Sequence, residues 1–192
     1  MATEVLLSFS NAGLGSIFAT WLRRRIMRAK SLFDTRSVYM DNIAMREQEG
    51  TELTQDRRFQ AESSGITLIG ARNASWNAGY LQAMSECSAM IIVATPEWAQ
   101  SQWTWQEFAQ ASLEAQRRGG SGGFRRVALA FDETDTDTRA KLTSDGWSLI
   151  PCRRIVVGGG QSHAGMDCPE ASAHQGGWVI GEANLQQVLA AI

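Results

Sequence analysis

The sequence has few cysteines, no long apolar run and almost no excess of charge of either sign. Its three cysteines are an odd number without the spacing of a disulfide framework, which favours free thiols in a reducing compartment. The longest uninterrupted apolar run, Ala89–Ala94, is far shorter than the roughly 20 residues that a membrane span needs. The net charge is −2 and the arginine pairs are scattered, which argues against a nucleic-acid or anionic-membrane surface. The first ten residues lack the basic segment of a secretory signal, so we expect a cytoplasmic protein.

The composition that remains is that of an ordinary soluble domain. The chain has 192 residues, of which 44% are hydrophobic and 20% charged, and it shows no internal repeat. We therefore expect a single domain over residues 1–192. It should carry a long variable loop around 42–75 and an irregular glycine-rich segment around 158–177.

Strand and helix patterns alternate along the chain. Apolar runs predict strands at 4–9, 37–41, 65–70, 88–95, 124–133 and 147–160. Helical patterns are found at 17–29, from Trp76 onward, from Pro96 to about Arg118, and at 181–192, with a helix or turn at 136–146. This order predicts a doubly wound α/β fold with a mainly parallel central sheet and helices on both faces. In such folds ligands bind beyond the carboxyl ends of the strands.

The stretch Ser101–Phe108, "SQWTWQEF", is unusual because it places two tryptophans and a glutamate at the start of a helix. With about 100° of rotation per residue, one set of side chains forms a stripe that we expect to pack in the core, and a second set forms a stripe roughly opposite. The expected core stripe consists of Trp105, Phe108, Ala109, Ser112 and Leu113. The opposite stripe consists of Trp103, Glu107, Gln110 and Glu114.

Two interpretations of Trp103 and Glu107 follow from this pattern. In the first, Trp103 covers a neighbouring loop and Glu107 is a solvated acid near the positive end of the helix. In the second, Trp103 forms one wall of a site whose reactive group is the carboxylate of Glu107. The helical period is compatible with both.

The block "CSAMIIVATPEWAQSQWTWQEF" resembles the central part of Toll/interleukin receptor (TIR) domains, in which an apolar strand is followed by S-x-W-x-x-x-E at the start of a helix. In this chain these positions are Ser101, Trp103 and Glu107. "EVLLSFS" is similar to the first strand of that family, and "SVYMD" is similar to the strand before its variable loop. The resemblance covers roughly residues 4–131 and implies a flavodoxin-like fold.

Enzymatic members of the family cleave NAD at the bond between nicotinamide and ribose, and the resemblance assigns the catalytic glutamate to Glu107. It implies NAD as substrate, with no further cofactor and no metal. A carboxylate is suited to this reaction because departure of nicotinamide leaves an oxocarbenium-like ribose. The implied substrate-binding residues are Phe9, Ser10, Asn11, Asp41, Ser101 and Trp103, with Trp76 and Tyr80 as candidates whose spacing equally fits a core stripe.

The resemblance also suggests a biological setting. A small TIR protein of this kind looks bacterial and is similar to the NAD-consuming partner of Thoeris-type antiphage systems. Such proteins convert NAD into a cyclic or otherwise modified ADP-ribose that activates a separate effector. We therefore expect self-association through TIR–TIR contacts and a downstream protein that senses the nucleotide product.

Other functions remain open at this point. A non-catalytic TIR interaction module would share the fold, and a nucleoside deoxyribosyltransferase would share the fold and an acidic catalyst. Gly13-x-Gly15 after the first strand is typical of part of a dinucleotide fingerprint or of a flavodoxin phosphate loop, but the third glycine is missing. The segment 152–174 contains zinc-type residues without paired ligand spacing, which favours an incidental surface loop: Cys152, His163, Cys168 and His174.

Overall fold

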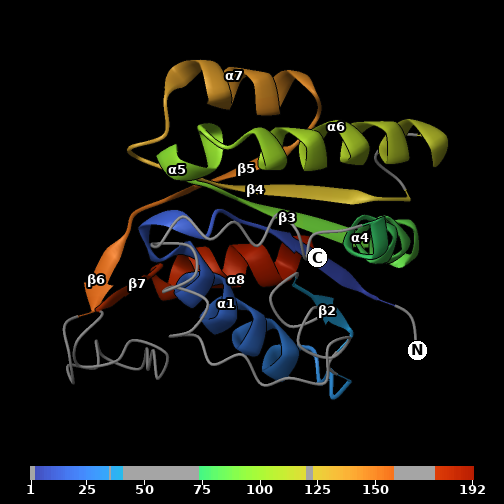
Figure 1. Ribbon diagram of the computed structural model, residues 1–192. Coiled ribbons are helices and arrows are strands. Elements are labelled where there is room, and N and C mark those ends of the chain that lie inside the picture. Colours follow the sequence, from blue (N-terminus) through green and yellow to red (C-terminus); the bar gives the residue numbers. More distant parts are fainter. Residues whose placement is uncertain (1–2, 35, 41–73, 120–122, 158–175) are drawn as a thin grey trace.

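The computed structural model describes residues 3–34, 36–40, 74–119, 123–157 and 176–192, with the backbone alone at 74–78 (Figure 1). The expected strand at 65–70 and almost all of the expected loop around 42–75 lie outside the described residues. Helix α4 begins at Ala74.

Five parallel strands form the central sheet in the order β2-β1-β3-β4-β5, which confirms the doubly wound α/β fold. Strand order reverses between β1 and β3, because the chain runs outward from β1 to β2 and later returns to β3 on the other side. The strands are β1 Val5–Ser8, β2 Val38–Tyr39, β3 Ala89–Ala94, β4 Arg125–Phe131 and β5 Ser148–Cys152.

Helices cover both faces of this sheet (Figure 1). Helix α1 (Gly15–Ala29) and helix α8 (Glu182–Ala191) pack on one face. Helices α4 (Ala74–Glu86), α6 (Gln102–Arg117) and α7 (Thr136–Ser144) contribute to the core on the other face. A 3-10 turn, η1 (Ala12–Leu14), connects β1 to α1.

Strand β3 shows why its sequence is apolar at every position. All six of its residues are buried. Because successive side chains point to opposite faces, Ile91 and Val93 enter the core beneath α1 and α8, whereas Met90 and Ile92 enter the core beneath α4 and α6. A central strand covered by helices on both faces needs an apolar residue at each position.

The single helix expected from Pro96 to Arg118 is wrong, because the segment forms two helices. Helix α5 (Pro96–Ala99) is followed by Ser101 in an extended conformation, and α6 begins at Gln102. The hydroxyl of Thr95 accepts a hydrogen bond from the backbone N–H of Trp98 and caps α5.

The single strand expected at 147–160 is also wrong. The strand is interrupted at Arg153 and Arg154, which follow β5 and are not part of a strand. After them, β6 (Ile155–Val157) pairs antiparallel with β7 (Gly177–Val179) outside the main sheet. Gly177, at the end of the irregular segment expected around 158–177, is the first residue of β7. Pro151 is tolerated because β5 is the edge strand of the sheet.

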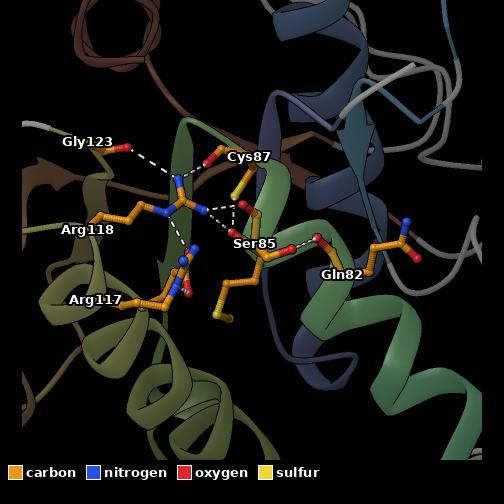
Figure 2. Close-up of polar contacts among 8 residues, drawn as sticks. Gln82, Ser85, Cys87, Arg117, Arg118 and Gly123 are labelled. Atoms are coloured by element: carbon orange, nitrogen blue, oxygen red, sulfur yellow. Dashed lines mark hydrogen bonds and ion pairs between the residues drawn. The ribbon is translucent and has the colours of Figure 1, made fainter.

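The far end of α6 is joined to the end of α4 by Arg118 (Figure 2). Its guanidinium donates hydrogen bonds to the backbone carbonyls of Met84 (2.7 Å), Ser85 (2.7 Å) and Cys87 (2.6 Å). These are carbonyls at the C-terminus of α4, which lack partners within the helix. Glu114 accepts a hydrogen bond from Arg118 at 2.5 Å and holds the guanidinium in place.

Candidate functional site

The candidate site lies at the carboxyl ends of β1 and β3, where the strand order reverses. Ser8 is the last residue of β1 and lies opposite Ile92 of β3. In open α/β sheets this reversal leaves a crevice between the connections that leave in opposite directions. The functional side chains should therefore be those that reach the end of β1.

Glu107 of α6 reaches that point. Its side chain is buried, with the residue 7% exposed, and its Oε2 accepts a hydrogen bond from Ser8 Oγ at 2.5 Å. The indole Nε1 of Trp98 donates to the same Ser8 Oγ at 3.0 Å. Ser8 and Trp98 are themselves buried, so these two hydrogen bonds join the end of β1, α5 and α6 in the interior of the protein.

Local contacts across the break between α5 and α6 set the direction in which α6 approaches the sheet. The hydroxyl of Thr104 donates to the carbonyl of Trp98 at 2.6 Å and to the carbonyl of Ser101 at 2.8 Å. The indole of Trp105 donates to the carbonyl of Ala99 at 2.8 Å. The break at Ser101 thus lets one short helix carry Trp98 and the next helix carry the glutamate.

Aromatic rings pack next to this turn. The ring centroids of Trp98 and Trp105 are 5.0 Å apart, and those of Trp105 and Phe108 are 5.3 Å apart. The ammonium group of Lys141 lies 4.0 Å from the centroid of the Trp105 ring. Trp105 is half-buried, packed against the core and covered by Lys141 of α7.

The core stripe expected for α6 is wrong in its position. The buried face consists of Thr104, Glu107, Phe108, Ala111 and Ala115, whereas Ala109 and Leu113 are exposed. The helix is rotated relative to the expectation because its sheet-facing side includes a threonine and a glutamate that are hydrogen-bonded, not apolar. The first interpretation of Glu107, as a solvated acid, is therefore wrong. Trp103 is exposed (37%), as its position on the helix predicts.

The residues expected just after β1 form the connection to α1. Phe9 packs partly against the core beneath α1, and Ser10 and Asn11 are half-buried. The hydroxyl of Ser10 accepts a hydrogen bond from the backbone N–H of Ala12 at 3.2 Å, which begins the turn. These residues follow Ser8 directly, so the turn starts beside the hydroxyl that Glu107 contacts.

The two glycines of this turn are required by its backbone. Gly13 has a φ of 60°, and a Cβ atom there would lie 2.4 Å from Oε1 of Glu97. A Cβ atom at Gly15 would lie 2.0 Å from the carbonyl oxygen of Ser10. Close packing thus accounts for the Gly13-x-Gly15 pattern.

An ion pair between Glu97 and Arg154 packs against the same turn. Arg154 Nη2 lies 2.8 Å from Glu97 Oε2, and its guanidinium lies 5.0 Å from the ring centroid of Trp178. Trp178 in turn donates its indole hydrogen to the carbonyl of Gly13 at 3.0 Å. Burial acts to raise the pKa of Glu97, but the hydrogen bond from Arg154 and other donors outweigh it, so that the pKa is lowered and the pair stays charged.

No model of a known protein family matches this sequence, and no curated protein matches it in sequence. The TIR resemblance stays a prediction.

The other predicted site residues are distributed differently. Asp41 and the side chain of Trp76 lie outside the described residues. Tyr80 is buried at 2% exposure in the core between α4 and the sheet, with its ring 6.0 Å from that of Tyr39. Ser101 is the half-buried residue that precedes α6, and its contacts are those of the helix start. Glu107 is therefore hydrogen-bonded to Ser8, which Trp98 also contacts. Tyr80 packs in the core, and Ser101 makes the contacts of a helix start.

The expected zinc-type segment is described only at Cys152. That residue is buried at the end of β5, and burial together with nearby Asp132 raises the pKa of its thiol to about 12. His163, Cys168 and His174 lie outside the described residues. Across the described ranges, no three His, Cys, Asp or Glu side chains are grouped as metal ligands would be. Within the same ranges, each helix is too short or too polar to cross a membrane.

Sequence reasoning missed Ser8 and Trp98. Ser8 is a polar residue at the last position of an otherwise apolar strand, and this pattern could have singled it out. Trp98 stands three residues after the capping Thr95, which places it in the first turn after the central strand. The hydrogen bond between them depends on the register of β1 beside β3, which a single sequence does not reveal.

Proposed function

We propose that this chain is an NAD glycohydrolase of the TIR type, with Glu107 as its catalytic carboxylate. The observation that carries the proposal is the buried position of Glu107 at the end of β1, where the winding of the sheet reverses. A glutamate is costly to bury, and one held at a ligand-binding edge of the fold is a functional candidate.

The reaction requires an ionised carboxylate and no proton donor for the leaving group. The bond between the ribose C1′ and the pyridinium nitrogen breaks, and its electron pair neutralises the departing nicotinamide. The positive charge that develops on the ribose is stabilised by an ionised carboxylate nearby. Water then adds to C1′ and loses a proton, which gives ADP-ribose. An intramolecular nucleophile in place of water gives a cyclic product, the kind of molecule that can serve as a signal to an effector.

The hydrogen bond from Ser8 supports an ionised Glu107. A hydroxyl that donates to a carboxylate stabilises the charged form relative to the neutral form. Trp103 lies one helical turn before Glu107 on the same helix and is 37% exposed, and its indole is of the ring type that stacks on a nicotinamide or adenine base.

The test is to incubate the purified chain with NAD at high protein concentration and to identify products by liquid chromatography and mass spectrometry. We expect nicotinamide release by the wild type and a loss of at least about 100-fold in Glu107→Gln. The matched control is Glu4→Gln, which removes an exposed carboxylate just before β1, at the end of the strand away from Ser8. The mass of the co-product distinguishes hydrolysis from cyclisation.

The outcomes separate the proposal from its alternatives. Equal turnover by the wild type and Glu107→Gln would refute the assigned role of Glu107. Turnover of free deoxynucleosides but not of NAD would identify a deoxyribosyltransferase instead. Absence of turnover on either substrate, with concentration-dependent self-association that Glu107→Gln leaves intact, would favour a TIR interaction module.

A further inference from the structure

The hydrogen bonds at the end of β1 have a fixed direction. An indole N–H is a donor only, so Trp98 uses Ser8 Oγ as an acceptor at 3.0 Å. The hydrogen of the Ser8 hydroxyl is therefore left for the carboxylate of Glu107, 2.5 Å away. Trp98, Ser8 and Glu107 thus form a hydrogen-bond chain in which Trp98 donates, Ser8 accepts and donates, and Glu107 accepts.

We propose that Ser8 is a positioning residue for Glu107, and that Trp98 acts on the carboxylate only by orienting the Ser8 hydroxyl. The inference rests on the proposed function in so far as the carboxylate is the catalytic group. The hydrogen-bond chain itself is a property of the protein without substrate.

Burial makes this chain effective. Trp98 is 0% exposed and Ser8 is 1% exposed, so water does not compete for the Ser8 hydroxyl. In a low-dielectric interior a donor that already accepts a hydrogen bond is polarised and donates more strongly. The hydroxyl therefore fixes the direction of one carboxylate oxygen and favours the ionised form of the acid.

Charged side chains on neighbouring helices have interactions of their own. Glu86 at the end of α4 accepts hydrogen bonds on the surface of the protein. Glu97 on α5 pairs with Arg154, and Lys141 on α7 lies over the ring of Trp105. These contacts of Glu86, Glu97 and Lys141 are made with groups other than Ser8 and the side chain of Trp98.

The test follows the side-chain carboxyl carbon of Glu107 by ¹³C NMR as the pH is varied, without substrate. The resonance is identified by its absence in Glu107→Gln. In Ser8→Ala we expect the pKa of Glu107 to rise by about one unit, because the charged form loses a donor. In Trp98→Phe we expect a smaller rise, because Ser8 can still donate. Ser8→Cys retains a weak donor and should give an intermediate value if Ser8→Ala does not fold.

A double-mutant cycle provides the decisive comparison. If Trp98 acts only through Ser8, then Ser8→Ala combined with Trp98→Phe raises the pKa no further than Ser8→Ala alone. An unchanged pKa in a folded Ser8→Ala variant would overturn the proposal. Additive shifts from the two substitutions would also overturn it, because Trp98 would then act independently.

Activity separates this inference from the proposed function. If the wild type cleaves NAD, Ser8→Ala should lower kcat with little change in KM. The acidic limb of its pH profile of kcat/KM, which reports the pKa of the protein without substrate, should move upward by the same amount as the NMR pKa. If the wild type does not cleave NAD but the NMR shifts follow the expected pattern, the positioning role stands and the proposed function fails.

Discussion

Helix α6 carries two glutamates, Glu107 and Glu114, about two turns apart, and the protein treats them in opposite ways. Glu107 faces the carboxyl end of β1 and accepts a hydrogen bond from a neutral hydroxyl. Glu114 lies toward the other end of the helix and accepts hydrogen bonds from the guanidinium groups of Arg117 and Arg118. The comparison shows that one helix can hold one glutamate by a neutral donor in the interior and another by two guanidinium groups near its C-terminus.

The difference lies in what each carboxylate holds together. Glu114 pairs with Arg118, whose guanidinium donates hydrogen bonds to carbonyls at the end of α4 (Figure 2). The ring centroid of Phe124 lies 4.9 Å from the same guanidinium. Guanidinium groups match a carboxylate in charge and geometry and would be difficult to displace by a substrate. The carboxylate of Glu107 accepts a hydrogen bond from a hydroxyl, which fixes the direction of one of its oxygens.

The largest expected effect comes from replacing each of the two glutamates by glutamine and comparing the variants. Glu107→Gln should lower NAD cleavage at least about 100-fold and leave stability unchanged or increased, because a buried charge is removed. Glu114→Gln should leave NAD cleavage within about twofold and lower the free energy of unfolding by about 1 to 2 kcal/mol. Product analysis and urea unfolding of both variants check this. A stability loss in Glu107→Gln equal to that in Glu114→Gln would break the comparison.

A second set of substitutions tests the contacts that Arg118 makes with Glu114 and with the carbonyls at the end of α4. Arg118→Ala should lower the free energy of unfolding by about 3 kcal/mol, because carbonyls at the end of α4 lose their donors and Glu114 loses a half-buried partner. Arg118→Lys should recover only part of this loss, because an ammonium group lacks the planar fork. The matched control is Arg117→Ala, since that side chain is 64% exposed and its pair with Glu114 is screened. Equal losses at both arginines would contradict the assignment.

Much of the sheet could be predicted from the sequence, because strand burial leaves a local signature. Every residue of β3 is apolar, and the alternation of strands and helices limits the topology. The strand β7 could not be predicted in the same way. It is three residues long, begins with glycine and is defined by its partner β6.

The site was only partly predictable for a related reason. The sequence singles out Glu107, but a helical wheel ranks positions by polarity and so assigns a glutamate to the wet face. Burial of Glu107 depends on Ser8, a residue far away in the sequence that the parallel register brings to the same point. Polar residues that satisfy one another in the interior are invisible to a pattern that counts only apolar positions.

The smallest expected effect concerns acid stability and bears on Glu114 alone. Hydrogen bonds from Arg117, opposed by burial and reinforced by Arg118, lower the pKa of Glu114 to about 2 in the folded protein. In the unfolded chain a glutamate titrates near 4.3. The ionised pair therefore contributes its full stability above about pH 4.3, and this contribution is lost as the pH falls toward 2. Urea unfolding of the wild type and Glu114→Gln should show the largest difference near neutral pH and a progressively smaller difference between pH 4.3 and 2. A difference that stays constant across this range would mean that Glu114 stabilises the protein by packing and not by its charge.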